Sequence, residues 1–177
     1  AVLSLAIGIL MKHGGEQIGW LLRPDEKGRS DNALNNLGRA ILEQHPYTLP
    51  PTIKITKNST VFIISDFLDP DEEIEIALKP FSECADNLFL IQILDPAELN
   101  LPFNGRIIFE NAEATERHHI NNAQSIRHIY QERINNHNKN LRNSCRKQGW
   151  HYGLHCTDKD AHNILMHIWA TLIREAA

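Results

Sequence analysis

The chain has 177 residues, of which 42% are hydrophobic and 23% are charged, and its formal net charge is −4. These values are typical of one folded domain with a hydrophobic core. With a sequence pI of about 6.2, they argue against a protein whose main task is nonspecific nucleic-acid binding. The three cysteines form no Cys-x-x-Cys pair, and no apolar run approaches the roughly 20 residues that span a bilayer. A reducing, cytoplasmic setting is therefore expected.

The first predicted element is a helix over residues 1–12, which Gly14 and Gly15 close. Its apolar residues surround the whole helix, a pattern typical of a helix buried in a larger protein. A βαβ unit also needs a strand before its helix. We therefore expect the natural sequence to contain a strand upstream of Ala1.

Four elements are predicted before residue 58: a strand at 17–22, a polar loop at 23–30, a helix at 31–44 and a short edge strand at 52–57. Ser30 or Asp31 can cap the helix. Pro24 and Gly28 are the reason for assigning a loop between the strand and the helix.

Two apolar runs of strand length each end in a carboxylate. Residues 60–65 precede Asp66, and residues 87–94 precede Asp95. A helix over 71–81, with acidic residues in its first turn, is predicted between them. Parallel strands place their carboxyl ends at one edge of a sheet, which is where open α/β sheets bind ligands. The sequence therefore predicts that Asp66 and Asp95 lie together at such an edge.

The rest of the chain is predicted to form a hairpin of 106–109 and 116–120, a helix at 122–148, a strand at 150–155 and a last helix capped by Thr157 or Asp158. Alternation of strands and helices predicts an α/β fold with a mostly parallel sheet covered on both faces, as a single domain over 1–177. If the strand before Ala1 is central, the chain leaves a gap in its own sheet. Such an open edge can recruit a second copy and form a homo-oligomer.

Several segments resemble those of the bacterial family called domain of unknown function 58. They are residues 14–19, 61–68, 94–102, Gly105 and 150–169. The likeness covers nearly the whole chain. Members of that family carry a von Willebrand factor A-like domain, so the resemblance implies a Rossmann-like three-layer fold.

The resemblance also implies a cation site at the carboxyl edge, but the chain carries an incomplete metal-ion-dependent adhesion site. The Asp-x-Ser-x-Ser loop is absent, Ser30 is a poor match to the second ligand position, and Asp66 matches the third. Mg²⁺ prefers several oxygen ligands in near-octahedral array. Asp66 with Ser65 and Ser30 would bind it weakly, so we expect no tightly held metal here. A working Mg²⁺ site in the intact protein depends on residues upstream of Ala1.

Other chemistries find little support. The ten histidines lack zinc-ligand spacing, and no Gly-x-Ser-x-Gly elbow is present.

Asp66 also has a purely structural interpretation, as a loop carboxylate that accepts backbone N–H bonds. Asp95 is followed by Pro96, and we interpret it first as a residue that shapes a turn. Basic residues on helix 122–148 are either a solvated face or a docking surface for an acidic partner.

The sequence favours a noncatalytic protein-interaction module that binds through edge loops around Ser30, Ser65, Asp66 and Asp95. The family resemblance implies an adaptor that works with a MoxR-type AAA+ ATPase in protein maturation or assembly. Two alternatives stay open. One is a metal-dependent hydrolase that uses Asp66 and Asp95, and the other is a nucleic-acid binder that uses helix 122–148.

Overall fold

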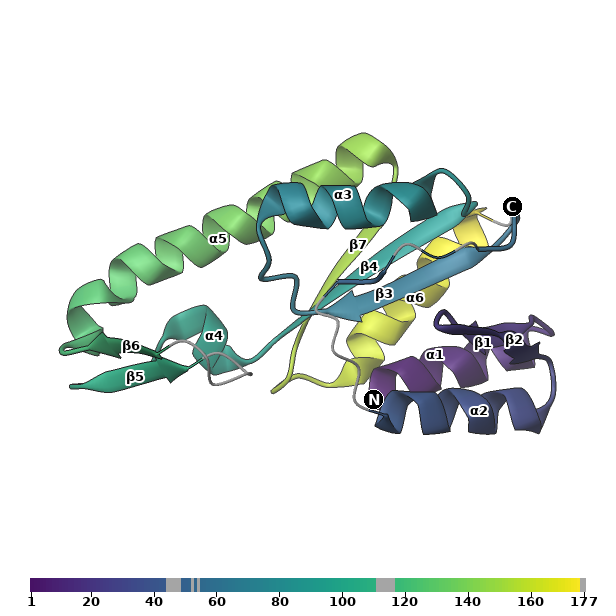
Figure 1. Ribbon diagram of the computed structural model, residues 1–177, viewed down its shortest axis with the longest axis horizontal. Helices are drawn as coiled ribbons and strands as arrows, with labels where there is room; N and C mark the ends of the chain where they lie inside the picture. Colours follow the sequence, from purple (N-terminus) through teal and green to yellow (C-terminus); the bar gives the residue numbers. More distant parts are fainter. Residues whose placement is uncertain (44–48, 52, 54, 111–116, 176–177) are drawn as a thin grey trace.

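The computed structural model describes residues 1–43, 49–51, 53, 55–110 and 117–175 (Figure 1). The chain has a mixed α/β fold. Its helices are α1 (Val2–His13), α2 (Asp31–Leu42), α3 (Asp71–Ser82), α4 (Pro96–Asn100), α5 (Ala123–Gln148) and α6 (Ala161–Glu175). Its strands are β1 (Ile18–Trp20), β2 (Arg23–Gly28), β3 (Thr60–Ser65), β4 (Asn87–Leu94), β5 (Ile107–Glu110), β6 (Arg117–Ile120) and β7 (His151–Cys156).

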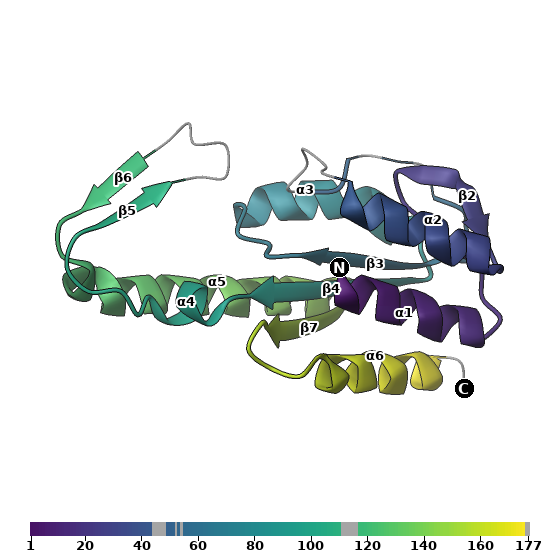
Figure 2. The same cartoon turned by 90° about the horizontal axis from the view of Figure 1, so that it is seen from below.

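The centre of the fold is a parallel three-stranded sheet in the order β3-β4-β7. β3 pairs with β4 from Thr60↔Asn87 to Ser65↔Gln92, and β4 pairs with β7 up to Leu94↔Cys156. Helices α3 and α5 cover one face, whereas α1 and α6 cover the other (Figures 1 and 2). The predicted parallel sheet with helices on both faces is confirmed.

Alternation along β4 explains the two hydrophobic cores. Leu88 and Leu90 contribute to the cluster beneath α3 and α5. Phe89 and Ile91 contribute to the cluster beneath α1 and α6. A strand buried on both faces is apolar at successive positions rather than at every second one, which is why residues 88–91 are all apolar.

The predicted loop over 23–30 is wrong. Residues Arg23–Gly28 form β2, which pairs antiparallel with β1 in a separate two-stranded sheet. Pro24 is tolerated because a two-stranded ribbon leaves half of its backbone groups outside the ladder. Gly19 allows the close approach, since a Cβ there would lie 2.8 Å from the Cβ of Lys27.

The short edge strand predicted at 52–57 is not found. Residues 52 and 54 lie outside the described part of the chain, and the described residues of this segment have no strand assignment. Ile55 packs instead against the core beneath α3 and α5. Lys27 Nζ also donates to Thr56 Oγ1 at 3.0 Å, which ties the segment to β2.

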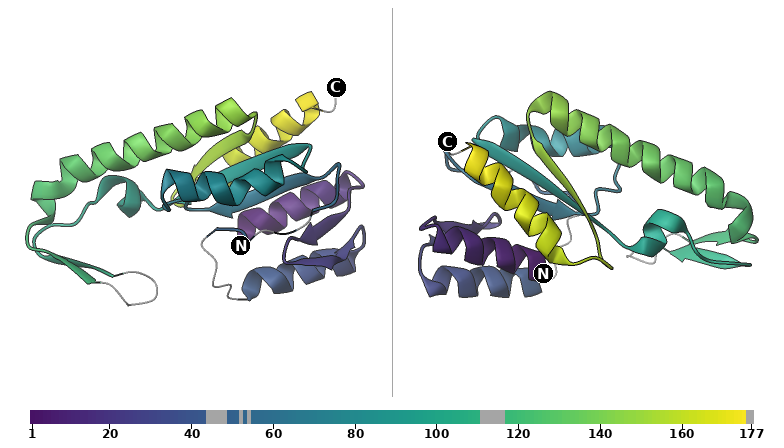
Figure 3. Two further views of the ribbon diagram at one scale, coloured as in Figure 1. Left: turned by 45° about the horizontal axis from the view of Figure 1, so that its top comes forward. Right: turned by 180° about the vertical axis from the view of Figure 1, so that it is seen from behind.

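An arm projects beyond the sheet, built from α4, the β5–β6 hairpin and the amino half of α5 (Figures 1 and 3). α5 has 26 residues and is therefore about 39 Å long, whereas the six residues of β7 span about 20 Å. Arg127 secures the arm by donating to the carbonyls of Leu101 at 2.9 Å and Phe103 at 2.8 Å. This arginine is thus engaged within the arm and does not add a free cation to the basic face of α5.

The hairpin predicted in the second half of the chain is confirmed as β5–β6, and residues 111–116 between its strands lie outside the described residues. The cap of α6 is neither Thr157 nor Asp158. Asp160 Oδ1 accepts from His162 N at 2.8 Å, because the helix begins only at Ala161. In the parts of the chain described above, every helix is too short or too polar to cross a membrane.

The first residue of β7 is a histidine whose pKa is shifted by burial. The His151 ring packs against the Phe89 ring at a tilt of 31°, with ring centroids 4.4 Å apart. Burial lowers its pKa from the usual 6.5, and the nearby Glu175 carboxylate only partly opposes this. The folded state therefore favours the neutral ring.

We expect the His151→Phe variant to show a weaker pH dependence of stability than the wild type. The folded chain binds fewer protons than the unfolded chain at this site, so the wild type loses unfolding free energy as the pH falls from about 7.5 to 5.5. Urea titrations across this range measure the difference. Parallel pH profiles for the two proteins would contradict the assignment.

Candidate functional site

The carboxyl ends of β3, β4 and β7 meet at one edge of the sheet (Figure 2). Asp66 follows the last residue of β3, Asp95 follows that of β4, and Thr157 follows that of β7. The predicted placement of Asp66 and Asp95 at a common edge is therefore correct. Thr157, which was not predicted as a site residue, joins them.

Asp66 is exposed and only loosely held. Its Oδ1 accepts from Leu68 N at 3.3 Å and from Ser65 Oγ at 3.4 Å, both long for hydrogen bonds. The next residue, Phe67, has φ of 49°, a left-handed conformation that costs about 1 kcal/mol. Its side chain is fully buried, which offsets that strain. The sharp turn thus anchors Phe67 in the core and leaves the Asp66 carboxylate in solvent.

Asp95 has a structural role, as its turn chemistry predicted. Its Oδ1 accepts from Ala97 N at 2.8 Å, and Glu98 Oε2 accepts from Asp95 N at 2.6 Å, which completes a capping box at the start of α4. Its Oδ2 accepts from Thr157 Oγ1 at 2.9 Å. Both carboxylate oxygens are therefore engaged, and they join the end of β7 to the start of the arm.

Ser30 does not join this edge. It precedes α2, which begins beside β2 at the end of the molecule where β3 starts (Figures 1 and 2). Its neighbour Asp31 pairs with Lys12 at the end of α1. The hydrogen bond and charge of Lys12 lower the pKa of the Asp31 carboxyl. Because the β1–β2 ribbon turns the chain back, the start of α2 is held away from Asp66.

The residues at this edge do not fit a magnesium ion. Asp95 has no free oxygen, Ser30 is elsewhere, and Ser65 Oγ accepts from Phe67 N at 3.4 Å. Within the described ranges, no three His, Cys, Asp or Glu side chains are grouped so that they could hold a metal ion. Asp66 with Ser65 falls short of the oxygen ligands that Mg²⁺ requires.

A buried amide supports the edge from below. Gln92 is 0% exposed. Its Nε2 donates to Asp66 O at 2.9 Å and to Asn138 Oδ1 at 3.0 Å. Its Oε1 accepts from Tyr152 OH at 2.6 Å. One side chain thus connects the end of β3 with β4, α5 and β7.

Tyr152 is kept as a donor in this network. Burial raises its pKa to about 12, which the charge of Arg142 opposes only partly. Sequence reasoning did not predict the network. The available signal was Gln92, a polar residue inside an apolar strand, because a buried amide must find hydrogen-bond partners.

A second polar contact joins α5 to the loop after Asp66. His137 Nε2 lies 2.5 Å from Phe67 O, and its Nδ1 lies 3.0 Å from Asp71 Oδ1. The Phe67 oxygen is a carbonyl acceptor, so Nε2 is the ring nitrogen that carries the proton at this contact. Asn140 Nδ2 also donates to Asp71 Oδ2 at 3.1 Å. These bonds fix the start of α3 against α5.

We expect Gln92→Leu to lower the unfolding free energy by about 2–3 kcal/mol, because the Tyr152 hydroxyl and the Asp66 carbonyl lose a buried partner. Tyr152→Phe removes one bond and should cost about 1 kcal/mol. Urea unfolding of both variants and of the double variant measures their coupling. A Gln92→Leu protein as stable as the wild type would refute the network.

The comparisons with known proteins identify the family of the chain. The family described as "Protein of unknown function DUF58" matches residues 1–140. Neither the curated proteins nor the solved structures gave a match to the chain. The match covers β3, β4 and most of α5, including Asp66, Gln92 and Asp95. The chain belongs to the DUF58 family.

Proposed function

We propose that the chain is a noncatalytic protein-binding module whose partner docks on the carboxyl edge of the β3-β4-β7 sheet. The observation that carries this proposal is the exposed Asp66 carboxylate, which accepts only long local hydrogen bonds. A charge presented in this way retains its hydrogen-bonding capacity for another molecule. Glu72 and Glu73, which are exposed in the first turn of α3, extend the acidic surface, so a basic partner surface would be complementary.

Rigidity beneath the edge supports binding. Gln92 holds the Asp66 backbone from below, and the Asp95 capping box fixes the neighbouring loop. Loops that are ordered before binding lose less conformational entropy when the complex forms. The edge therefore presents the exposed Asp66 carboxylate on a backbone that is already ordered, and this arrangement suits recognition of a protein surface.

The same contacts favour binding over hydrolysis. Asp95, the second carboxylate of the hydrolase alternative, gives both oxygens to Ala97 and Thr157. Cys156 is the nearest thiol, and burial together with a hydrogen bond to Asp158 raises its pKa. A raised pKa leaves less of the thiolate that nucleophilic catalysis requires. These groups are suited to holding the edge rather than to attacking a substrate.

The proposal includes a von Willebrand factor A-like fold and a MoxR-type AAA+ ATPase as the partner class, as the family resemblance implies. Three parallel strands with helices on both faces support that fold. An adaptor role in protein maturation or assembly follows from this partner class.

Asp66→Ala tests the docking edge. We expect binding to the MoxR-type ATPase of the same genome, measured by calorimetry with ATP present, to weaken at least about tenfold, a loss of about 1.4 kcal/mol. The fold should survive, because the replaced carboxylate is exposed. Asp25→Ala is the matched control, an exposed aspartate on β2, and should bind like the wild type.

Equal binding by the Asp66→Ala and wild-type proteins would contradict the docking edge. A screen of phosphate-ester substrates addresses the hydrolase alternative. Turnover that Asp66→Ala abolishes would replace the binding module with an enzyme.

A further inference from the structure

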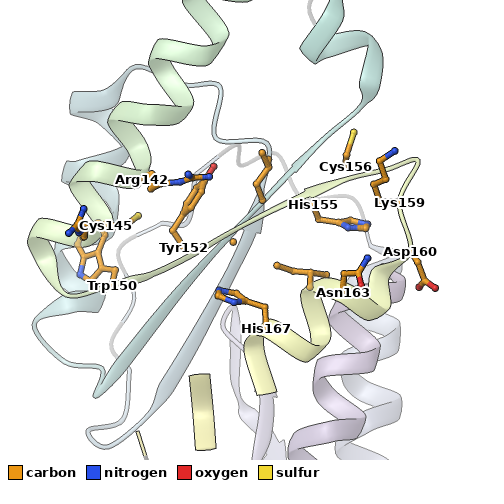
Figure 4. Close-up of a pocket in the computed structure, with 14 residues that line it drawn as sticks. Arg142, Cys145, Trp150, Tyr152, His155, Cys156, Lys159, Asp160, Asn163 and His167 are labelled. Carbon is orange, nitrogen blue, oxygen red and sulfur yellow. The ribbon is translucent and has the colours of Figure 1, made fainter. Parts of the chain in front are cut away.

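The outer edge of β7 lies in a groove between two helices. Within the described residues, β7 pairs with β4 alone, so it ends the sheet on this side. A strand with one neighbour directs half of its N–H and C=O groups away from the ladder. α5 and α6 flank this edge on opposite faces and enclose a groove of about 740 Å³ (Figure 4).

The groove has an apolar floor and polar walls. Leu154 on β7 is 37% exposed, a high value for a leucine inside a strand. Arg142 on α5 lies on one side, and Asn163 and His167 on α6 lie on the other (Figure 4). Gly153 allows α6 to pack closely here, because a Cβ at that position would lie 2.5 Å from Ile164 Cδ1. The edge of β7 is therefore flanked but not covered.

The charges around the groove are mainly positive. Arg142, Arg146 and Lys159 line it, whereas Asp160 is the single carboxylate among its described lining residues. Asp160 is already engaged as the cap of α6. The Arg142 guanidinium lies 5.4 Å from the centroid of the Tyr152 ring, a contact that holds it at the groove without using its N–H donors. The local charge is opposite to the net charge of −4.

We infer that the outer edge of β7 binds an extended acidic peptide segment of a partner protein as an added strand. Strand addition uses the unpaired backbone groups of the edge for affinity and the flanking side chains for specificity. Alternate side chains of the added strand point toward opposite faces of the sheet. Acidic residues on the α5 face would meet Arg142 and Arg146, and the alternate residues would lie on the α6 face beside Asn163 and His167.

A second copy of this chain suits the groove less well. Two β7 strands paired antiparallel about a two-fold axis make one continuous sheet, and this places both α5 helices on the same face. Arg142 and Arg146 would then face the same residues of the second copy. Like charges oppose such a pairing, whereas an acidic strand neutralises them. The groove is also distinct from the acidic carboxyl edge, so this inference does not depend on the proposed function.

The test uses the whole chain and a fluorescein-labelled peptide, acetyl-(Val-Glu)₄-amide, in fluorescence anisotropy. We expect saturable binding that weakens as salt is added. Arg142→Glu with Arg146→Glu should weaken binding at least about tenfold. The matched control is Lys139→Glu with Lys147→Glu, which makes the same change in net charge on exposed residues of α5 outside the groove.

Further peptides separate strand addition from simple charge attraction. The lysine version, acetyl-(Val-Lys)₄-amide, should not bind. Two methylated versions, one with N-methylated glutamates and one with N-methylated valines, keep every carboxylate. The N–H groups of alternate residues point to the same side of a strand, so one of the two methylated versions should bind at least about tenfold more weakly. Equal affinity of both methylated versions and the unmethylated peptide would overturn strand addition.

Other results would also overturn the inference. They are no binding of the acidic peptide, equal loss of binding in both double variants, or competition by single-stranded DNA at lower concentration than the peptide. A dimer in sedimentation that Arg142→Glu with Arg146→Glu strengthens would assign the edge to a second copy instead.

Discussion

The hydrogen bonds of the Gln92 side chain are the constraint on which the carboxyl edge depends. A buried amide without partners costs about 1–3 kcal/mol, so its three partners are fixed relative to one another wherever the fold forms. Those partners are the Asp66 carbonyl, Asn138 and Tyr152. They belong to the loop after β3, to α5 and to β7. The sheet, its covering helix and the exposed loop are thereby held as one unit.

The fold separates charge between two edges of the same sheet. The carboxyl edge carries the exposed Asp66 and the acidic first turn of α3. The lateral edge along β7 carries Arg142 and Arg146. α5 contributes to both, because His137 secures the loop after Asp66 while the two arginines lie further along the helix. One long helix therefore supports two surfaces of opposite sign, each suited to a different partner.

Sequence patterns predicted the elements in which the burial of each residue is reflected in its own polarity. The runs at 60–65 and 87–94 are mainly apolar because β4 is buried on both faces and β3 packs beside it, and their carboxyl ends located Asp66 and Asp95 correctly. Patterns failed where pairing with another segment decides the structure. β2 contains Pro24 and is largely polar, yet β1 pairs with it.

The candidate site also contains residues whose roles local patterns predicted and residues whose roles they did not. The capping role of Asp95 could be predicted because its partners lie within three residues. Contacts across long sequence separations could not, since no local pattern encodes them. Gln92 and Tyr152 are 60 residues apart, and so nothing near either one indicates the other. Ser30 was assigned to the edge through a motif comparison, and the backtracking of β1–β2 holds it elsewhere.

The most direct test of this account is the exchange of the Gln92 side-chain amide protons, followed by NMR in deuterated water. Two hydrogen bonds donated by a fully buried side chain predict that both Nε2 protons exchange only through unfolding of the whole domain, at the rate of the most protected backbone amides of β4. Exchange at the rate of an exposed glutamine would show that the carboxyl edge is not built on this side chain.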